Sequence, residues 1–150
     1  MSNPVLIDTS AWVEYLRATG SRHDLAVASA LRSPQGVLMP AVVLQEVLQG
    51  ARSPSHFMAL QTALEAIDVF EPEDWPHLHA QAALLYARCR WQGLTVRNPI
   101  DCVVAACALE AELPLLARDA DFVHLQRIAP ALQLMQAPPS PDNAFLKTAP

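Results

Sequence analysis

The chain has 150 residues, of which 52% are hydrophobic, so it can bury one core and is too short for two ordinary domains. Its formal net charge of -5 at pH 7 argues against a protein that binds nucleic acid through an overall basic surface. A nucleic-acid substrate would have to be held locally, by a bound cation and a few arginines.

Short apolar runs alternate with helical periodicity along the first part of the chain, so strands are expected to lead directly into helices. The expected elements are, in chain order, a strand at 5–7, helices at 10–16 and 24–31, a strand at 37–39, and helices at 40–48, 55–67 and 75–92. Gly50 can end the third of these helices.

The next helix has the clearest boundaries in the sequence, because Asn98 is a suitable N-cap and Pro99 suits the first helical position. Two further short strands are expected at 115–117 and 132–135. Strands separated by helices are typical of an α/β protein with a parallel sheet and right-handed crossovers.

The end of the chain differs in composition from the rest. The stretch 137–141 is rich in proline, cannot donate a regular hydrogen-bond ladder, and has a polar continuation. We therefore expect residues 1–136 to form the folded domain and residues 137–150 to be a disordered tail.

The cysteines and the amino-terminal sequence bear on the compartment. Cys89, Cys102 and Cys107 lack metal-ligand spacing and have apolar neighbours, which predicts small buried side chains in a reducing cytosol. The chain has no signal-peptide pattern at its start and no apolar run of membrane-spanning length. We expect a cytoplasmic protein with no membrane partner.

Four acidic residues lie at the ends of segments that otherwise have the composition of a core. Asp8 closes the first expected strand and Asp119 follows the third. Because ligands bind at the carboxyl ends of parallel strands, these two carboxylates are expected to lie close together. Asp101 is in the first turn of its helix, where the helix dipole favours a negative charge. Glu46 interrupts an apolar helix and must face either water or a neutralising group.

Two interpretations of these acids are open on spacing alone. If the four carboxylates converge, their oxygen atoms suit a hard divalent cation, Mg²⁺ or Mn²⁺. Alternatively, Asp8 caps the following helix, Asp101 is placed for its helix dipole, and Glu46 is a solvated residue on an amphipathic face. Periodicity does not decide between them.

Four blocks of sequence carry the acids: VLIDTSAW at 5–12, PAVVLQEV at 40–47, TVRNPIDCVVAA at 95–106 and LLARDADF at 115–122. Together and in this order they resemble a PIN domain, and within that family a VapC-type toxin ribonuclease of a type II toxin–antitoxin system. The resemblance implies a three-layer α/β/α domain with a short parallel sheet. It also implies a Mg²⁺- or Mn²⁺-dependent endoribonuclease that hydrolyses RNA phosphodiester bonds.

The resemblance assigns roles position by position. The family's catalytic, metal-binding quartet matches four residues of this chain, Asp8, Glu46, Asp101 and Asp119. In the implied mechanism the three aspartates hold the metal, while the glutamate completes the outer shell or orients a water. Asp121 matches a further acid that often lies close by, and Thr9 and Ser10 match a segment whose hydroxyl orients the first acid or a metal-bound water. Many relatives have Thr, Ser or His in place of Ala117, so the polar contacts around the acids are expected to differ.

Nearby arginines could hold the RNA. Arg97 and Arg118 precede two of the acids and could receive RNA phosphates bidentately. The open alternative is ordinary surface ion pairing with a neighbouring carboxylate, that of Glu110, Glu112 or Asp121. Because spacing places none of the five histidines as a general base, we expect attack by water, which leaves a 5′-phosphate and a 3′-hydroxyl.

The resemblance also implies partners, namely a second copy of the chain in a homodimer and a cognate VapB-like antitoxin. The antitoxin's carboxyl-terminal segment would lie in a groove and place a basic side chain among the acids. Candidates for the groove, and equally for the core, are Trp12, Tyr15, Leu16, Val43 and Leu44. Two other functions stay open, a non-catalytic PIN scaffold that binds RNA or protein, and a metal-dependent DNA nuclease or phosphatase.

Overall fold

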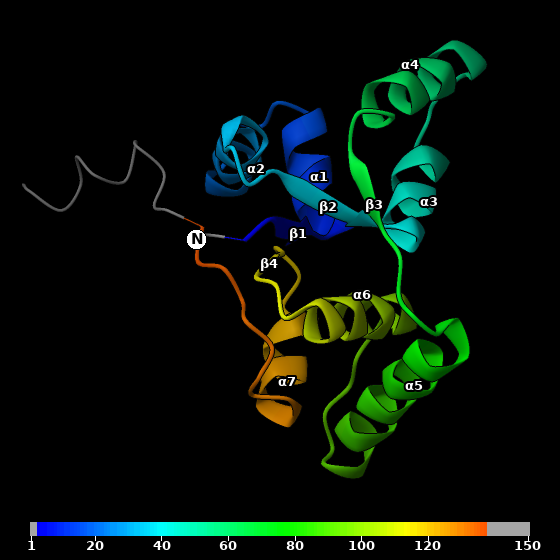
Figure 1. The fold of residues 1–150 in the computed structure, drawn as a ribbon, viewed down its shortest axis with the longest axis vertical. Helices are drawn as coiled ribbons and strands as arrows, with labels where there is room; N and C mark the ends of the chain where they lie inside the picture. Colours follow the sequence, from blue (N-terminus) through cyan, green and yellow to red (C-terminus); the bar gives the residue numbers. More distant parts are fainter. Residues whose placement is uncertain (1–2, 138–150) are drawn as a thin grey trace, which may run out of the picture.

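A four-stranded parallel sheet with helices on both faces forms the framework of the computed structural model, which describes residues 3–137 (Figure 1). The strands are β1 (Val5–Ile7), β2 (Val37–Pro40), β3 (Asp68–Phe70) and β4 (Leu115–Leu116). The helices are α1 (Thr9–Leu16), α2 (Arg22–Arg32), α3 (Ala41–Gln49), α4 (Pro54–Leu64), α5 (Trp75–Trp91), α6 (Pro99–Ala111) and α7 (Asp121–Ile128). In Figure 1, α1 and α2 lie on one side of the sheet, and α5, α6 and α7 lie on the other. The expected α/β fold with a short parallel sheet is confirmed.

The strand order is β3-β2-β1-β4, which places β1 between two parallel neighbours. Leu6 of β1 is in register with Leu38 of β2 and with Leu115 of β4, and it is completely buried. Burial on both faces explains why β1 has a continuous apolar run instead of an alternating one. The chain builds outward from β1 to β3 and then returns to add β4 on the opposite side. The carboxyl ends of β1 and β4 therefore form a switch point of the kind where ligands bind in open α/β sheets.

Two elements differ from the sequence-based expectation in the sheet. The edge strand β3 was not predicted, because only Phe70 of its three residues is buried and the expected apolar pattern is missing. The strand expected at 132–135 is wrong. In this segment only Leu134 pairs with Leu115, as an isolated parallel bridge. Hydrogen bonds from the Leu115 N–H to the Gln133 carbonyl and from the Met135 N–H to the Leu115 carbonyl account for that single bridge.

The helix α7 was also not predicted. Its buried residues Phe122, Leu125 and Ile128 recur at helical spacing but are separated by polar side chains, and the helix is only eight residues long. All three cysteines are free and buried, as expected. Within residues 3–137, no helix is both long and apolar enough to cross a membrane. Apart from Ala137, which packs against the core, the expected tail lies outside the described residues.

Candidate metal-binding and catalytic site

Asp8 both caps a helix and leaves one carboxylate oxygen free. As the N-cap of α1, its Oδ2 accepts hydrogen bonds from the Ser10 backbone N–H at 3.0 Å and from the Ser10 hydroxyl at 2.7 Å. Its Oδ1 is buried and has no hydrogen-bond partner within residues 3–137. A buried carboxylate oxygen without a partner is costly, and a cation would compensate it. The capping role expected as an alternative is therefore real, and it does not exclude metal binding.

The Ser10 hydroxyl joins the two loops at the switch point. It donates to Asp8 and accepts the backbone N–H groups of Arg118 at 2.9 Å and of Asp119 at 3.3 Å. The loop after β4 is thereby held against the loop after β1 through one side chain. Ala117 contributes no polar group there, and Ser10 supplies the hydrogen bonds that fix this loop.

Glu46 projects from α3 and is held by side chains from two other helices. The Thr9 hydroxyl of α1 donates to Oε1 at 2.8 Å, and Asn98 Nδ2 donates to Oε2 at 3.4 Å. Asn98 also caps α6, because its Oδ1 accepts the Ile100 N–H at 3.0 Å. Sequence reasoning found the cap and missed the contact with Glu46, which joins residues 52 positions apart. Glu46 is therefore a fixed member of the site and not a freely solvated residue.

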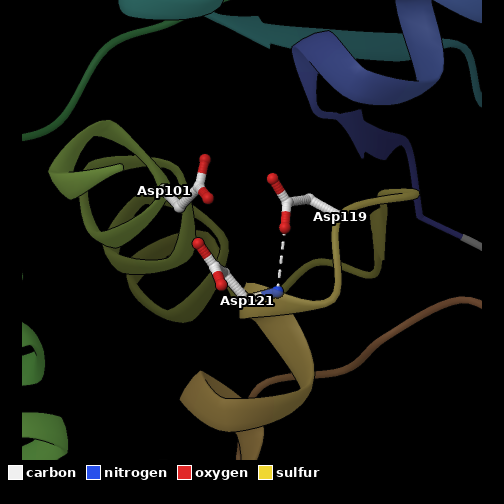
Figure 2. Close-up of side chains that lie close together, drawn as sticks. All are labelled: Asp101, Asp119 and Asp121. Carbon is white, nitrogen blue, oxygen red and sulfur yellow. Dashed lines mark hydrogen bonds between the residues drawn. The ribbon is translucent and has the colours of Figure 1, made fainter. Parts of the chain in front are cut away.

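Three aspartates form the tightest group of carboxylates. One oxygen each of Asp101, Asp119 and Asp121 lies within 4.8 Å of the other two, and the three side chains come from α6, the loop after β4 and the start of α7 (Figure 2). The Asp121 backbone N–H donates to Asp119 Oδ1 at 2.9 Å, which fixes that carboxylate. Asp121, the least certain member of the predicted set, is thus placed in the cluster. Asp8 and Glu46 do not meet the same distance limit.

The electrostatics nevertheless couple all five acids. Burial, and then the negative charges of the four other carboxylates, raise the pKa of Asp101 to about 8. Burial also raises the pKa of Asp8 above its ordinary value, against the lowering effect of the hydrogen bonds from Ser10. Asp101 Oδ2, like Asp8 Oδ1, is buried without a hydrogen-bond partner in the described part of the chain. Unpartnered, all-oxygen donors with uncompensated negative charge fit a hard divalent cation.

Comparison with known proteins decides the family. A model of the PIN domain matches residues 5–128, which includes every acid of the site. The chain belongs to the PIN domain family. It is also 36% identical over 125 residues to ribonuclease VapC11 of Mycobacterium tuberculosis, an alignment that covers 83% of this chain and 92% of that protein. At this identity and coverage, the chain belongs with the VapC proteins of the family.

Solved structures show the same fold at lower identity. VapBC2 from Rickettsia felis, bound to a DNA fragment from its promoter, has a TM-score of 0.67 and 17% identity, covering 87% of this chain and 96% of that one. VapBC-5 from Mycobacterium tuberculosis, a member of the VapBC family of toxin–antitoxin systems, has a TM-score of 0.62 and 21% identity, covering 89% and 98%. At these identities, the likeness establishes the PIN fold alone.

Both arginines predicted near the acids of this PIN domain are engaged with carboxylates. The Arg97 backbone N–H donates to Asp121 Oδ2 at 2.8 Å, and its Nε lies 3.8 Å from Asp121 Oδ1. The Arg118 guanidinium pairs with Glu14, which the alternative of surface ion pairing had not included. A hydrogen bond from the Thr19 hydroxyl, together with Arg118, lowers the pKa of Glu14. The ion-pair alternative therefore describes both arginines in this structure.

The apolar positions proposed for a groove divide between core and surface. Trp12 and Val43 are buried in the core, so neither can line an open groove or stack on a base. Tyr15 and Leu44 are half-buried, and Leu16 is exposed on α1. Only the last of these faces a hollow, which lies beside Glu46.

Proposed function

We propose that this PIN-domain protein is the toxin of a VapBC-type system, a metal-dependent endoribonuclease that hydrolyses RNA phosphodiester bonds. One observation carries the proposal: Asp101, Asp119 and Asp121 converge at the switch point of the sheet, beside buried carboxylate oxygens without partners. The 36% identity to ribonuclease VapC11 supports RNA as the substrate. The acids would act at one phosphodiester of a strand that the surrounding surface positions.

The carboxylates divide into metal ligands and orienting groups. Asp8, Asp101 and Asp119, with Asp121, would hold Mg²⁺ or Mn²⁺ through the oxygen atoms that lack protein partners. When bound, the ion supplies charge for a phosphate oxygen and lowers the pKa of a water. Glu46, fixed on both oxygens by Thr9 and Asn98, would orient the attacking water by accepting its hydrogen bond.

Protons must leave the site when a cation enters it. The pKa of Asp101 is about 8, so this carboxyl carries a proton at neutral pH as long as no cation compensates its neighbours. Cation binding would therefore release a proton and become tighter as the pH rises. Ser10 would keep Asp8 and Asp119 in place through this change, because its hydroxyl contacts Asp8 and the Asp119 backbone.

The proposed partners follow from the same family. The chain would act in the cytoplasm as a homodimer and be neutralised by a VapB-like antitoxin. The VapBC toxin–antitoxin structures that share its fold support the antitoxin. A basic side chain of that antitoxin would be attracted to the five acids for the same Coulombic reason as a metal ion.

Cleavage of purified substrates tests the activity. Wild-type protein is incubated with single-stranded RNA, single-stranded DNA and a chromogenic phosphate ester, each with Mg²⁺, with Mn²⁺ and with EDTA. We expect RNA cleavage alone, only with a divalent cation, with 5′-phosphate and 3′-hydroxyl ends and none by Asp8→Asn. Asparagine keeps the cap of α1 in that variant. RNA binding without cleavage would instead indicate a scaffold, and cleavage of DNA or the ester would indicate a different hydrolase.

A further inference from the structure

A hollow of about 450 Å³ lies beside Glu46, where α1, α3 and α4 meet. Its floor is apolar and includes Val13 of α1 and Val47 of α3. Three basic side chains line it as well, from the end of α1, the loop before α4 and the first turn of α4: Arg17, Arg52 and His56. We call this hollow the basic groove. One of its lining residues, Glu46, also belongs to the acidic site, so the two are continuous.

The two arginines of the basic groove are free to bind an external anion. Within residues 3–137, ion pairs are formed by Arg97 with Asp121 and by Arg118 with Glu14, and neither Arg17 nor Arg52 forms one. Both free arginines are exposed. In a chain of net charge -5, two unpaired arginines in one groove make a local positive region.

His56 adds a third donor with a fixed orientation. Its Nδ1 accepts the Arg52 backbone N–H at 3.1 Å, so a neutral ring carries its proton on Nε2. The same hydrogen bond ties the loop that carries Arg52 to the first turn of α4. The amino-terminal end of this helix adds partial positive charge at the same place. Every one of these features favours a negatively charged ligand.

We propose that the basic groove binds the sugar–phosphate backbone of the RNA substrate beside the phosphate to be cleaved, with Arg17 and Arg52 as the phosphate-contacting residues. The inference rests on the proposed ribonuclease function. A strand with one phosphate at the acids must continue across the adjoining surface, and the basic groove begins at Glu46. Its apolar floor suits the faces of unpaired bases. Two free guanidinium groups favour a polyanion over a protein segment that would have to place a basic side chain among the acids.

The salt dependence of RNA binding tests the groove. Binding of a fluorescein-labelled single-stranded RNA of mixed sequence is followed by anisotropy with Mg²⁺, in the Asp8→Asn background so that the RNA stays intact. Each phosphate contact on a single strand contributes about 0.7 to the slope of log K against log salt. We expect Arg17→Gln/Arg52→Gln to make that slope shallower by about 1.4 and to weaken binding roughly tenfold at low salt.

A matched control separates the groove from net charge. Arg32→Gln/Arg127→Gln removes the same charge from two exposed positions at the ends of α2 and α7, and we expect its slope to equal that of the parent protein. Thermal unfolding of each variant checks that it is folded. In the wild-type background, the groove variant should raise the KM for RNA cleavage more than it lowers kcat.

Two results would overturn the inference while leaving the ribonuclease assignment intact. One is cleavage by the wild type with the same salt slope for the groove variant and the control. The other is unchanged RNA binding by the groove variant together with lost binding of the antitoxin, which would assign the groove to a protein segment. If the wild type neither binds nor cleaves RNA, the proposed function itself fails, and the groove inference fails with it.

Discussion

At the scale of single residues, the site depends on side chains that have two tasks. Asp8 caps α1 with one oxygen and keeps the other free of protein partners. Ser10 orients the capping oxygen and holds the loop that carries Asp119. A capping interaction and a ligand site are therefore compatible on one carboxylate, because its two oxygens face different surroundings. Structural and functional interpretations of such residues need not compete.

Removing the Ser10 hydroxyl should loosen both loops. Ser10→Ala leaves the Arg118 and Asp119 N–H groups without their acceptor and removes a hydrogen bond that lowers the pKa of Asp8. We expect a loss of about 1–3 kcal/mol in the free energy of unfolding, measured by urea denaturation. Ser55→Ala removes an exposed hydroxyl from α4 and serves as the control. Equal stability of the two variants would contradict the tying role of Ser10.

The raised pKa of Asp101 predicts how stability depends on pH when no divalent cation is present. The folded protein keeps this proton up to a pH of about 8, whereas the unfolded chain loses it near 3.8. The folded state then binds more protons than the unfolded state, so the free energy of unfolding falls as the pH rises between these values. The steepest fall for one proton is about 1.4 kcal/mol per pH unit. Urea denaturation in EDTA between pH 5 and pH 9 measures it.

Asp101→Asn is the control for this pH dependence, because asparagine cannot titrate. We expect the variant to lack the component of the slope that belongs to Asp101, while the raised pKa of Asp8 leaves a smaller decline. A wild-type protein that becomes more stable from pH 5 to pH 9 in EDTA would show that Asp101 is ionised in the folded state.

At the scale of elements, the sequence predicts those with strong local signals. β1 is an unbroken apolar run and α6 has both an N-cap and a proline at its start, so both were found. β3 and α7 were missed because partial exposure of the first and interleaved polar residues in the second weaken their periodicity. The segment at 132–135 has the composition of a strand, but only one of its residues pairs.

The candidate site was predictable to the same degree. The strand ends predicted that Asp8 and Asp119 would lie near each other, since that follows from parallel topology alone. Asp121 came from the family resemblance, and its contact with Asp119 depends on where α7 begins. The contact of Asn98 with Glu46 joins α6 to α3. No local pattern encodes such a contact, because it depends on how the two helices pack.

Asn98 allows the stability of α6 to be separated from the positioning of Glu46. Asn98→Ser should keep the cap and lose the Nδ2 donor to Glu46, so we expect nearly unchanged stability and slower RNA cleavage. Asn98→Ala should lose both, with a destabilisation of about 1 kcal/mol in urea denaturation. Initial cleavage rates at saturating RNA measure the effect on catalysis. Wild-type rates in the serine variant would show that Glu46 needs no help from Asn98.

At the scale of the whole molecule, charge is distributed unevenly in a way that net charge hides. The chain is acidic overall, and five of its carboxylates converge near the switch point of the sheet, where they raise the pKa of Asp101. The fold therefore brings together groups that repel one another. Packing of the sheet and helices must offset that repulsion when no cation is present. A bound cation would convert this unfavourable interaction into a favourable one, and so would couple metal binding to global stability.

Thermal unfolding with added cation tests this coupling. At a Mg²⁺ or Mn²⁺ concentration 100 times Kd, binding to the folded state alone adds about 2.7 kcal/mol, which for a chain of this size raises Tm by roughly 5–10 °C. We expect this shift for the wild type in scanning fluorimetry, and little shift for Asp119→Asn/Asp121→Asn, which removes two members of the tightest cluster. Asp68→Asn changes an exposed acid at the start of β3, away from the carboxyl ends of the strands, and should respond like the wild type. An equal shift in all three proteins would place the stabilising ion outside this site.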